Sequence, residues 1–98
     1  MSAIIDDVTI PPNTIHHVIF SLGGGVIITG EAVNEQQRLE IDEILNSLQQ
    51  NQTVEYDAVD RRGRRSHGAG NIIGIERNEE PVGTLMRIRY SISIQYIH

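Results

Sequence analysis

The chain has no cysteine and no lysine among its 98 residues. The lack of cysteine excludes a disulfide framework, a thiolate metal site and a cysteine nucleophile, so stability must come from packing. The lack of lysine makes all eight basic residues arginine. Arginine offers a planar fork of donors that binds carboxylate or phosphate in a fixed geometry, although codon bias or drift would give the same composition.

Long apolar runs are also missing. No segment approaches the roughly 18 apolar residues of a membrane-spanning helix. Asp6, Asp7, Pro11 and Pro12 interrupt the region where a signal peptide needs an unbroken apolar run. We therefore expect a cytoplasmic protein with no membrane partner. The formal net charge of −5 disfavours a protein that coats nucleic acid with its whole surface, because most of that surface would repel a polyanion.

Isoleucine dominates the apolar residues, which form 39% of the chain. Its β-branched side chain suits a pleated sheet better than a helix, and a chain of this length builds one core. We therefore expect residues 1–98 to form a single globular α+β domain. Its mainly antiparallel sheet, a sandwich or partly open barrel of about six strands, would be packed by one amphipathic helix.

The helix is predicted at about Asn34–Gln50. Asn34 is a favoured N-cap, and Gln37 three residues later completes a capping-box pattern. Asn51 is the expected left-handed residue at the end of the helix. An apolar stripe wide enough to lie on a sheet follows a helical spacing; it consists of Ile41, Ile44, Leu45 and Leu48.

The strands before the helix are less regular. Ala3–Ile10 predicts an edge strand or an arm, since the prolines after it remove two backbone donors, and its pairing partner could lie in its own chain or in a neighbour. Thr14–Leu22 is apolar on both faces, which favours a central strand. Gly23–Gly25 predicts a hairpin turn into a strand at Val26–Thr29, because glycine takes positive φ without steric cost.

After the helix, alternation predicts a strand from Val54 that stops at Asp60, a loop over Arg61–Gly70, and turn-rich sequence over Asn78–Gly83. A long strand follows from Thr84, with strict alternation from Met86 onward. Because this strand exceeds the usual five or six residues, it must bend, or else reach outward and offer unpaired backbone to another subunit. We therefore expect a homo-oligomer.

The predicted loop holds four of the eight arginines and several glycines. Guanidinium groups on a flexible backbone bind phosphates bidentately, so the loop is the candidate ligand or partner site. The alternative is a solvated loop whose arginines pair with nearby acids at Asp57, Asp60, Glu76, Glu79 and Glu80. The candidate binding residues are Arg61, Arg62, Arg64, Arg65, His67, Arg87 and Arg89.

No catalytic constellation is present in the sequence. The glycine spacing matches neither a Walker A loop nor a dinucleotide fingerprint, and no nucleophile-elbow pattern surrounds Ser66 or His67. His16 and His17 are adjacent, so on a strand they should point to opposite faces, with one of them packed. We therefore expect no enzyme, no cofactor and no metal.

Three hypotheses about function remain open. The first is a non-catalytic binding or assembly protein that self-associates through β-strands and presents the Arg/Gly-rich loop to a protein partner. The second is nucleic-acid or phosphate-ligand binding through the same loop, with affinity that falls steeply with salt. The third is a small inhibitor or immunity-type protein, of viral or mobile-element origin, that blocks another protein.

Overall fold

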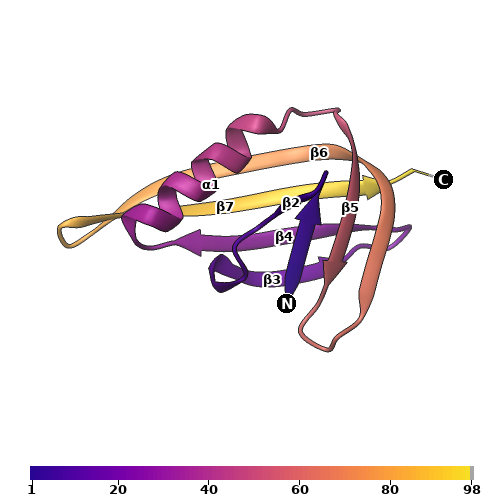
Figure 1. The fold of residues 1–98 in the computed structure, drawn as a ribbon, viewed down its shortest axis with the longest axis horizontal. Helices are drawn as coiled ribbons and strands as arrows, with labels where there is room; N and C mark the ends of the chain where they lie inside the picture. Colours follow the sequence, from indigo (N-terminus) through magenta and orange to yellow (C-terminus); the bar gives the residue numbers. More distant parts are fainter. Residues whose placement is uncertain (98) are drawn as a thin grey trace.

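The computed structural model describes residues 1–97, which form one antiparallel sheet of seven strands with a helix lying on it (Figure 1). The strand order across the sheet is β2-β1-β5-β6-β7-β4-β3. The predicted α+β class with one helix and a long C-terminal strand is confirmed. The elements are β1 (Ser2–Ile5), β2 (Val8–Thr9), a 3-10 turn (Pro12–Thr14), β3 (Ile15–Phe20), β4 (Gly25–Ala32), α1 (Glu35–Ser47), β5 (Thr53–Val59), β6 (Arg65–Val82) and β7 (Leu85–Tyr96).

Strand β6 changes partner along its length, and this bends the sheet. Up to Asn71 it pairs with β5, and from Gly70 onward it pairs with β7. In Figure 1, β1 and β5 accordingly run across the direction of β7, β4 and β3. A Cβ atom at Gly70 would lie 2.5 Å from Ile94 Cγ2, so a residue without a side chain is needed at the point where β6 changes partner.

Helix α1 begins as predicted and ends earlier. The Asn34 side chain accepts a hydrogen bond from the Gln37 amide at 2.8 Å, and Gln37 Oε1 accepts one from the Val33 amide at 3.0 Å. These bonds satisfy amides that have no partner inside the helix. The predicted end at Gln50 is wrong, because Leu48 already has extended backbone. Asn51 is left-handed at φ 70°, beyond the helix rather than at its cap.

Two predictions about the first strands are wrong. Ala3–Ile10 is a hairpin of β1 and β2 rather than one edge strand or arm, because Asp6 and Asp7 both take positive φ and turn the chain. Strand β1 of this hairpin pairs with β5 of the same chain, not with a neighbouring subunit. The strand within Thr14–Leu22 is β3, which pairs only with β4 among the described residues and so ends the sheet instead of lying at its centre.

The predicted loops are shorter than expected. Strand β6 begins at Arg65, so the turn after β5 covers only the first part of Arg61–Gly70. The same strand continues through Val82, so most of Asn78–Gly83, predicted as a turn, is strand that pairs with β7. Glycines and charged residues in these two segments favour turns locally. Pairing of β6 with β7 at twelve positions outweighs this preference for a turn in the second segment.

The alternation predicted for β7 is confirmed. Ile88, Tyr90, Ile92 and Ile94 are buried and face the core. Strand β7 lies between β6 and β4, and both neighbours bind its backbone. The long strand is thus paired on both sides from Ile88 to Gln95, and its remaining residues pair with β6 alone, so within the described residues it leaves no long row of free backbone groups for another subunit.

A buried polar pair in the core is formed by Thr14 and Tyr90. Thr14 Oγ1 lies 2.8 Å from the Pro11 carbonyl oxygen and 2.8 Å from the Tyr90 hydroxyl oxygen. Since the single hydroxyl proton of Thr14 goes to Pro11, Tyr90 donates to Thr14. Burial raises the pKa of Tyr90. Within residues 1–97 no helix has the length and apolar character needed to span a bilayer.

Candidate functional site

The arginine hairpin, defined here as residues 60–65 between β5 and β6, is organised around one carboxylate. Asp60 is 6% exposed and accepts hydrogen bonds from the amides of Arg62 at 3.0 Å and Arg64 at 2.8 Å. It also accepts one from Arg64 Nε at 2.8 Å. Gly63 has φ 80°, which closes the turn without strain. The loop is thus held in one shape rather than being a flexible glycine-rich segment.

Two of the four hairpin arginines are already neutralised. Burial acts to raise the pKa of Asp60, but the hydrogen bonds from Arg64 and Arg62 together outweigh it and leave that pKa below its usual range. Arg65 binds Asp57 through two hydrogen bonds of 2.8 and 2.7 Å. These bonds are the main cause of the lowered pKa of Asp57. The predicted alternative, pairing with Asp57 and Asp60, therefore describes these two arginines.

Arg61 and Arg62 differ from their neighbours. Both are exposed, and neither has an ion pair among residues 1–97. His67 lies on β6 directly across from Asp57 and is also exposed. Arg64 additionally lies over the ring of Phe20, 5.8 Å from its centroid, which joins the hairpin to β3. The free cationic groups of the hairpin are therefore the two at its tip.

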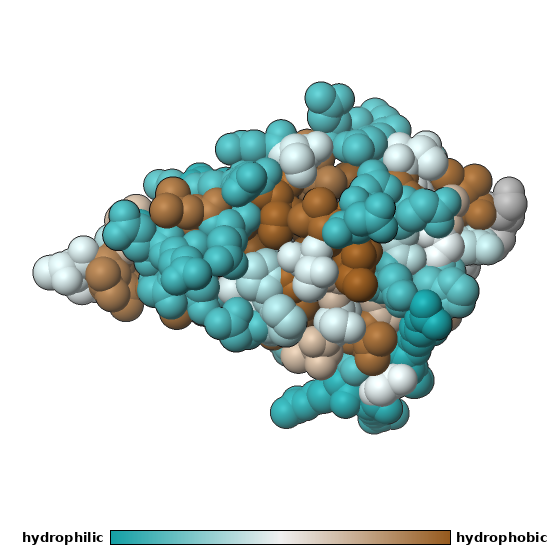
Figure 2. Space-filling model, in the orientation of Figure 1, coloured by the Kyte–Doolittle hydropathy of each residue, from teal (hydrophilic) through white to brown (hydrophobic). Residues whose placement is uncertain are grey.

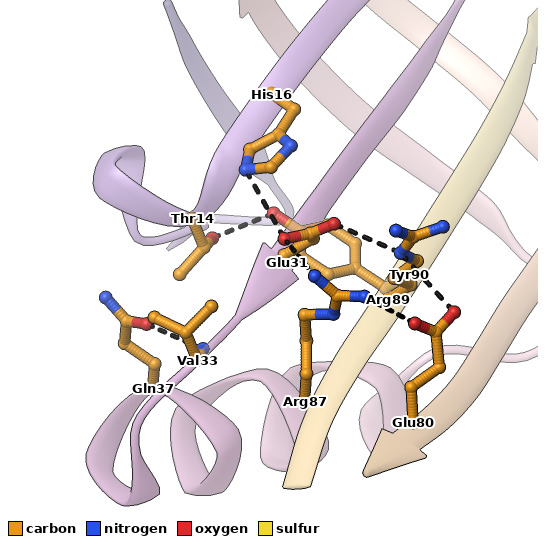
Figure 3. Close-up of polar contacts among 9 residues, drawn as sticks. All are labelled: Thr14, His16, Glu31, Val33, Gln37, Glu80, Arg87, Arg89 and Tyr90. Atoms are coloured by element: carbon orange, nitrogen blue, oxygen red, sulfur yellow. Dashed lines mark hydrogen bonds and ion pairs between the residues drawn. The ribbon is translucent and has the colours of Figure 1, made fainter. Parts of the chain in front are cut away.

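Arg87 and Arg89 do not extend this hairpin. They lie beside β4 and the far part of β6, where they form a charge cluster with Glu31, Glu80 and His16 (Figure 3). Arg89 Nε is 3.1 Å from Glu31 Oε1 and 3.5 Å from Glu80 Oε1, and Arg87 binds Glu80. The hydrogen bond from Arg87 lowers the pKa of Glu80 and raises the pKa of Arg87. Both guanidiniums are therefore compensated by carboxylates, and the seven candidate residues do not form one cationic surface.

The histidines are placed differently from the prediction. His16 and His17 are both exposed, and neither is packed in the core. The ladder between β3 and β4 shifts register between Ile15 and His17, and this irregularity breaks the expected alternation of faces. His16 Nε2 then lies 4.0 Å from Glu31 Oε2 on the outer face of the sheet.

The open edges of the sheet are a feature that the sequence did not locate. Strand β2 at one end has only two residues. The far part of β6 pairs with β7 alone, but it contains Pro81 and several charges, and Arg77 bridges to Asp42 of α1 at 2.6 Å. Short length, proline and charge are the usual protections of a sheet edge. Strand β3, at the other end, has six residues and contains no proline, carboxylate or arginine, and the irregularity between Ile15 and His17 leaves Val18–Phe20 in regular pairing.

The outer face beside β3 is also apolar. Ile19 is 52% exposed, and Leu22 in the following turn is fully exposed. Leu22, Ile27 and Ile73 contribute to a shallow groove of about 300 Å³ next to the glycine turn. A strand edge without proline or fixed charge, next to exposed isoleucine, is a surface that pairs with another strand.

No protein-family model, curated protein sequence or solved structure matches this chain. The candidate sites therefore depend on the geometry described above.

Proposed function

We propose that this chain is a non-catalytic assembly protein that pairs with a second copy of itself along the β3 edge. The observation that supports the proposal is the contrast among the open edges. Two are shortened or blocked by charge and proline, whereas β3 offers the segment Ile15–Phe20 without a charged carboxylate, arginine or proline. An edge strand without such protection is a template for strand addition.

The pairing would be isologous. Two antiparallel β3 strands related by a twofold axis join two seven-stranded sheets into one continuous sheet, and each copy contributes the same surface. Every second residue of β3 has its backbone N–H and C=O directed away from β4. These groups supply the hydrogen bonds of the junction, while Ile19 adds apolar contact on the outer face.

Ile19→Lys is expected to convert a dimer into a monomer. In a symmetric junction the substitution places two ammonium groups beside the same short ladder, and like charges across strands destabilise pairing. Size-exclusion chromatography with light scattering in about 500 mM salt, which screens contacts between charged surfaces, measures the change as a fall from twice the 11.0 kDa chain mass to the chain mass.

Val82→Lys is the matched control. Val82 is 48% exposed against 52% for Ile19, but it lies at the end of β6, which is not a neighbour of β3 in the sheet, and it does not line the groove beside β3. The control variant is expected to remain dimeric. A wild-type chain that stays monomeric at high micromolar concentration would contradict the proposal, as would a dimer that Val82→Lys dissociates and Ile19→Lys does not.

A second candidate function is phosphate or nucleic-acid binding at the hairpin tip, supported by the lack of ion pairs at Arg61 and Arg62 in the described residues. Because the other candidate arginines are paired, at most two phosphates are contacted. The logarithm of the DNA affinity should then fall by no more than about 1.8 per log unit of salt, at about 0.9 per contact. A titration of duplex DNA at several salt concentrations measures this slope. A fall of about 5 log units per log unit of salt would instead indicate that all six candidate arginines contact phosphates.

A further inference from the structure

A second surface suited to a partner lies between α1 and β2. It is a groove of about 380 Å³ whose lining combines apolar side chains, called its floor here, with two carboxylates, called its rim. Figure 2 shows hydrophobic residues beside the helix, bordered by hydrophilic ones. Val8 is 43% exposed there. The groove is lined by Val8, Thr9, Pro11, Glu40, Glu43, Ile44 and Ser47.

The two carboxylates at the rim are not compensated by cations. Glu40 accepts a hydrogen bond from the neutral amide of Gln36 at 3.2 Å, and neither Glu40 nor Glu43 has an ion pair in the described part of the chain. Asp42 on the same helix shows the contrast, since it binds Arg77. A ligand with cationic groups on apolar stems would satisfy both the rim and the floor of this groove.

The chain itself carries such a group at the tip of the arginine hairpin. Arg61 and Arg62 are exposed and without an ion pair among residues 1–97, and each has an aliphatic stem that covers apolar surface. The Asp60 bonds hold the hairpin in one shape. In Figure 1 the β5–β6 turn projects from the edge of the molecule, on the side away from α1. A hairpin held in this way does not fold back across the sheet, so its complement is the groove of another copy.

We propose that the Arg61–Arg62 tip of one copy docks in the groove between α1 and β2 of a second copy, where the guanidiniums bind Glu40 and Glu43. The two surfaces differ, so the contact is heterologous and generates a ring or an open filament. It is independent of the isologous β3 junction. Together, the two contacts would build a higher assembly from one chain.

The test is charge reversal with rescue, carried out in the Ile19→Lys background so that β3 pairing does not contribute. One variant carries Arg61→Glu with Arg62→Glu, and the other carries Glu40→Arg with Glu43→Arg. Alone, each places like charges on both surfaces, which should weaken self-association at least about 100-fold. Mixed in equal amounts, the acidic tip of one fits the basic groove of the other, and the basic tip fits the acidic groove.

Sedimentation velocity at about 50 mM and about 500 mM salt provides the measurement, because screening is much stronger at the higher concentration. The Ile19→Lys parent is expected to associate at low salt and to dissociate at high salt. The mixture of the two reversed variants should recover the association that each lacks, which also shows that both are folded. A parent that is monomeric at low salt overturns the proposal, and so does a mixture that stays monomeric. Since the β3 junction is absent from every sample, neither result bears on the proposed dimer.

Discussion

Replacing Gly30 with alanine is expected to destabilise the fold by at least about 3 kcal/mol, the upper end for overpacking a closed core. A Cβ atom at Gly30 would lie 2.1 Å from the Thr14 carbonyl oxygen and 2.5 Å from the Tyr90 hydroxyl oxygen. The first contact is with backbone, so no rotamer change relieves it. Because small domains have a total stability of about 5–15 kcal/mol, urea denaturation should show a large shift of the midpoint or an unfolded variant.

Gly74→Ala is the control for this substitution. Gly74 also lies in a strand, but a Cβ atom there would be 3.8 Å from Ser93, an ordinary contact. Alanine at this position should leave stability unchanged or raise it by about 0.5 kcal/mol, because it restricts the unfolded chain. If both variants lost the same free energy of unfolding, the close approach of β4 to the Thr14–Tyr90 pair would not explain why Gly30 cannot be replaced.

Breaking the Thr14–Tyr90 hydrogen bond is expected to cause the second large loss of stability. Thr14→Val keeps the shape of the side chain but leaves the Tyr90 hydroxyl buried without this acceptor, at an expected cost of about 1–3 kcal/mol. Tyr90→Phe removes the other partner. The double variant should lose clearly less than the sum of the two single losses, since no unsatisfied hydroxyl then remains. Strictly additive losses in urea denaturation would contradict the hydrogen bond.

The same pair predicts a dependence on alkaline pH. Burial raises the pKa of Tyr90 in the folded state above its ordinary value of 10.0, so the folded chain holds this proton when the unfolded chain has lost it. The free energy of unfolding is therefore unaffected by Tyr90 below about pH 10 and falls as the pH rises further. Tyr90→Phe should flatten this fall in thermal melts, and an unchanged profile would exclude Tyr90 as its cause.

Features set by short-range pattern were predictable. The alternation in β7 is unbroken, and one face of a strand must be buried, so its core residues could be identified directly. The start of α1 followed from the oxygen of Asn34 and its distance of three residues from Gln37. In both cases the physical cause acts within one element.

Features that depend on distant segments were not predictable. Whether β3 is central or at an edge depends on which strand joins it, and its apolar residues on both faces suggested burial. Arg87 and Arg89 were predicted to belong to the same binding site as the loop arginines. The register of β6, β7 and β4 instead places them beside Glu80 and Glu31. The cross-strand partner of a charge is fixed only when the whole sheet is assembled.

The change of partner along β6 has a consequence for the order of assembly. From Thr53 to Tyr96 the chain is a three-stranded meander whose pairings close only short turns, and such local loops cost little chain entropy. The β1–β5 and β4–β7 ladders join segments far apart in sequence, so they close much longer loops. Folding should therefore be nucleated in the carboxy-terminal half, with the amino-terminal strands added to a template that already exists.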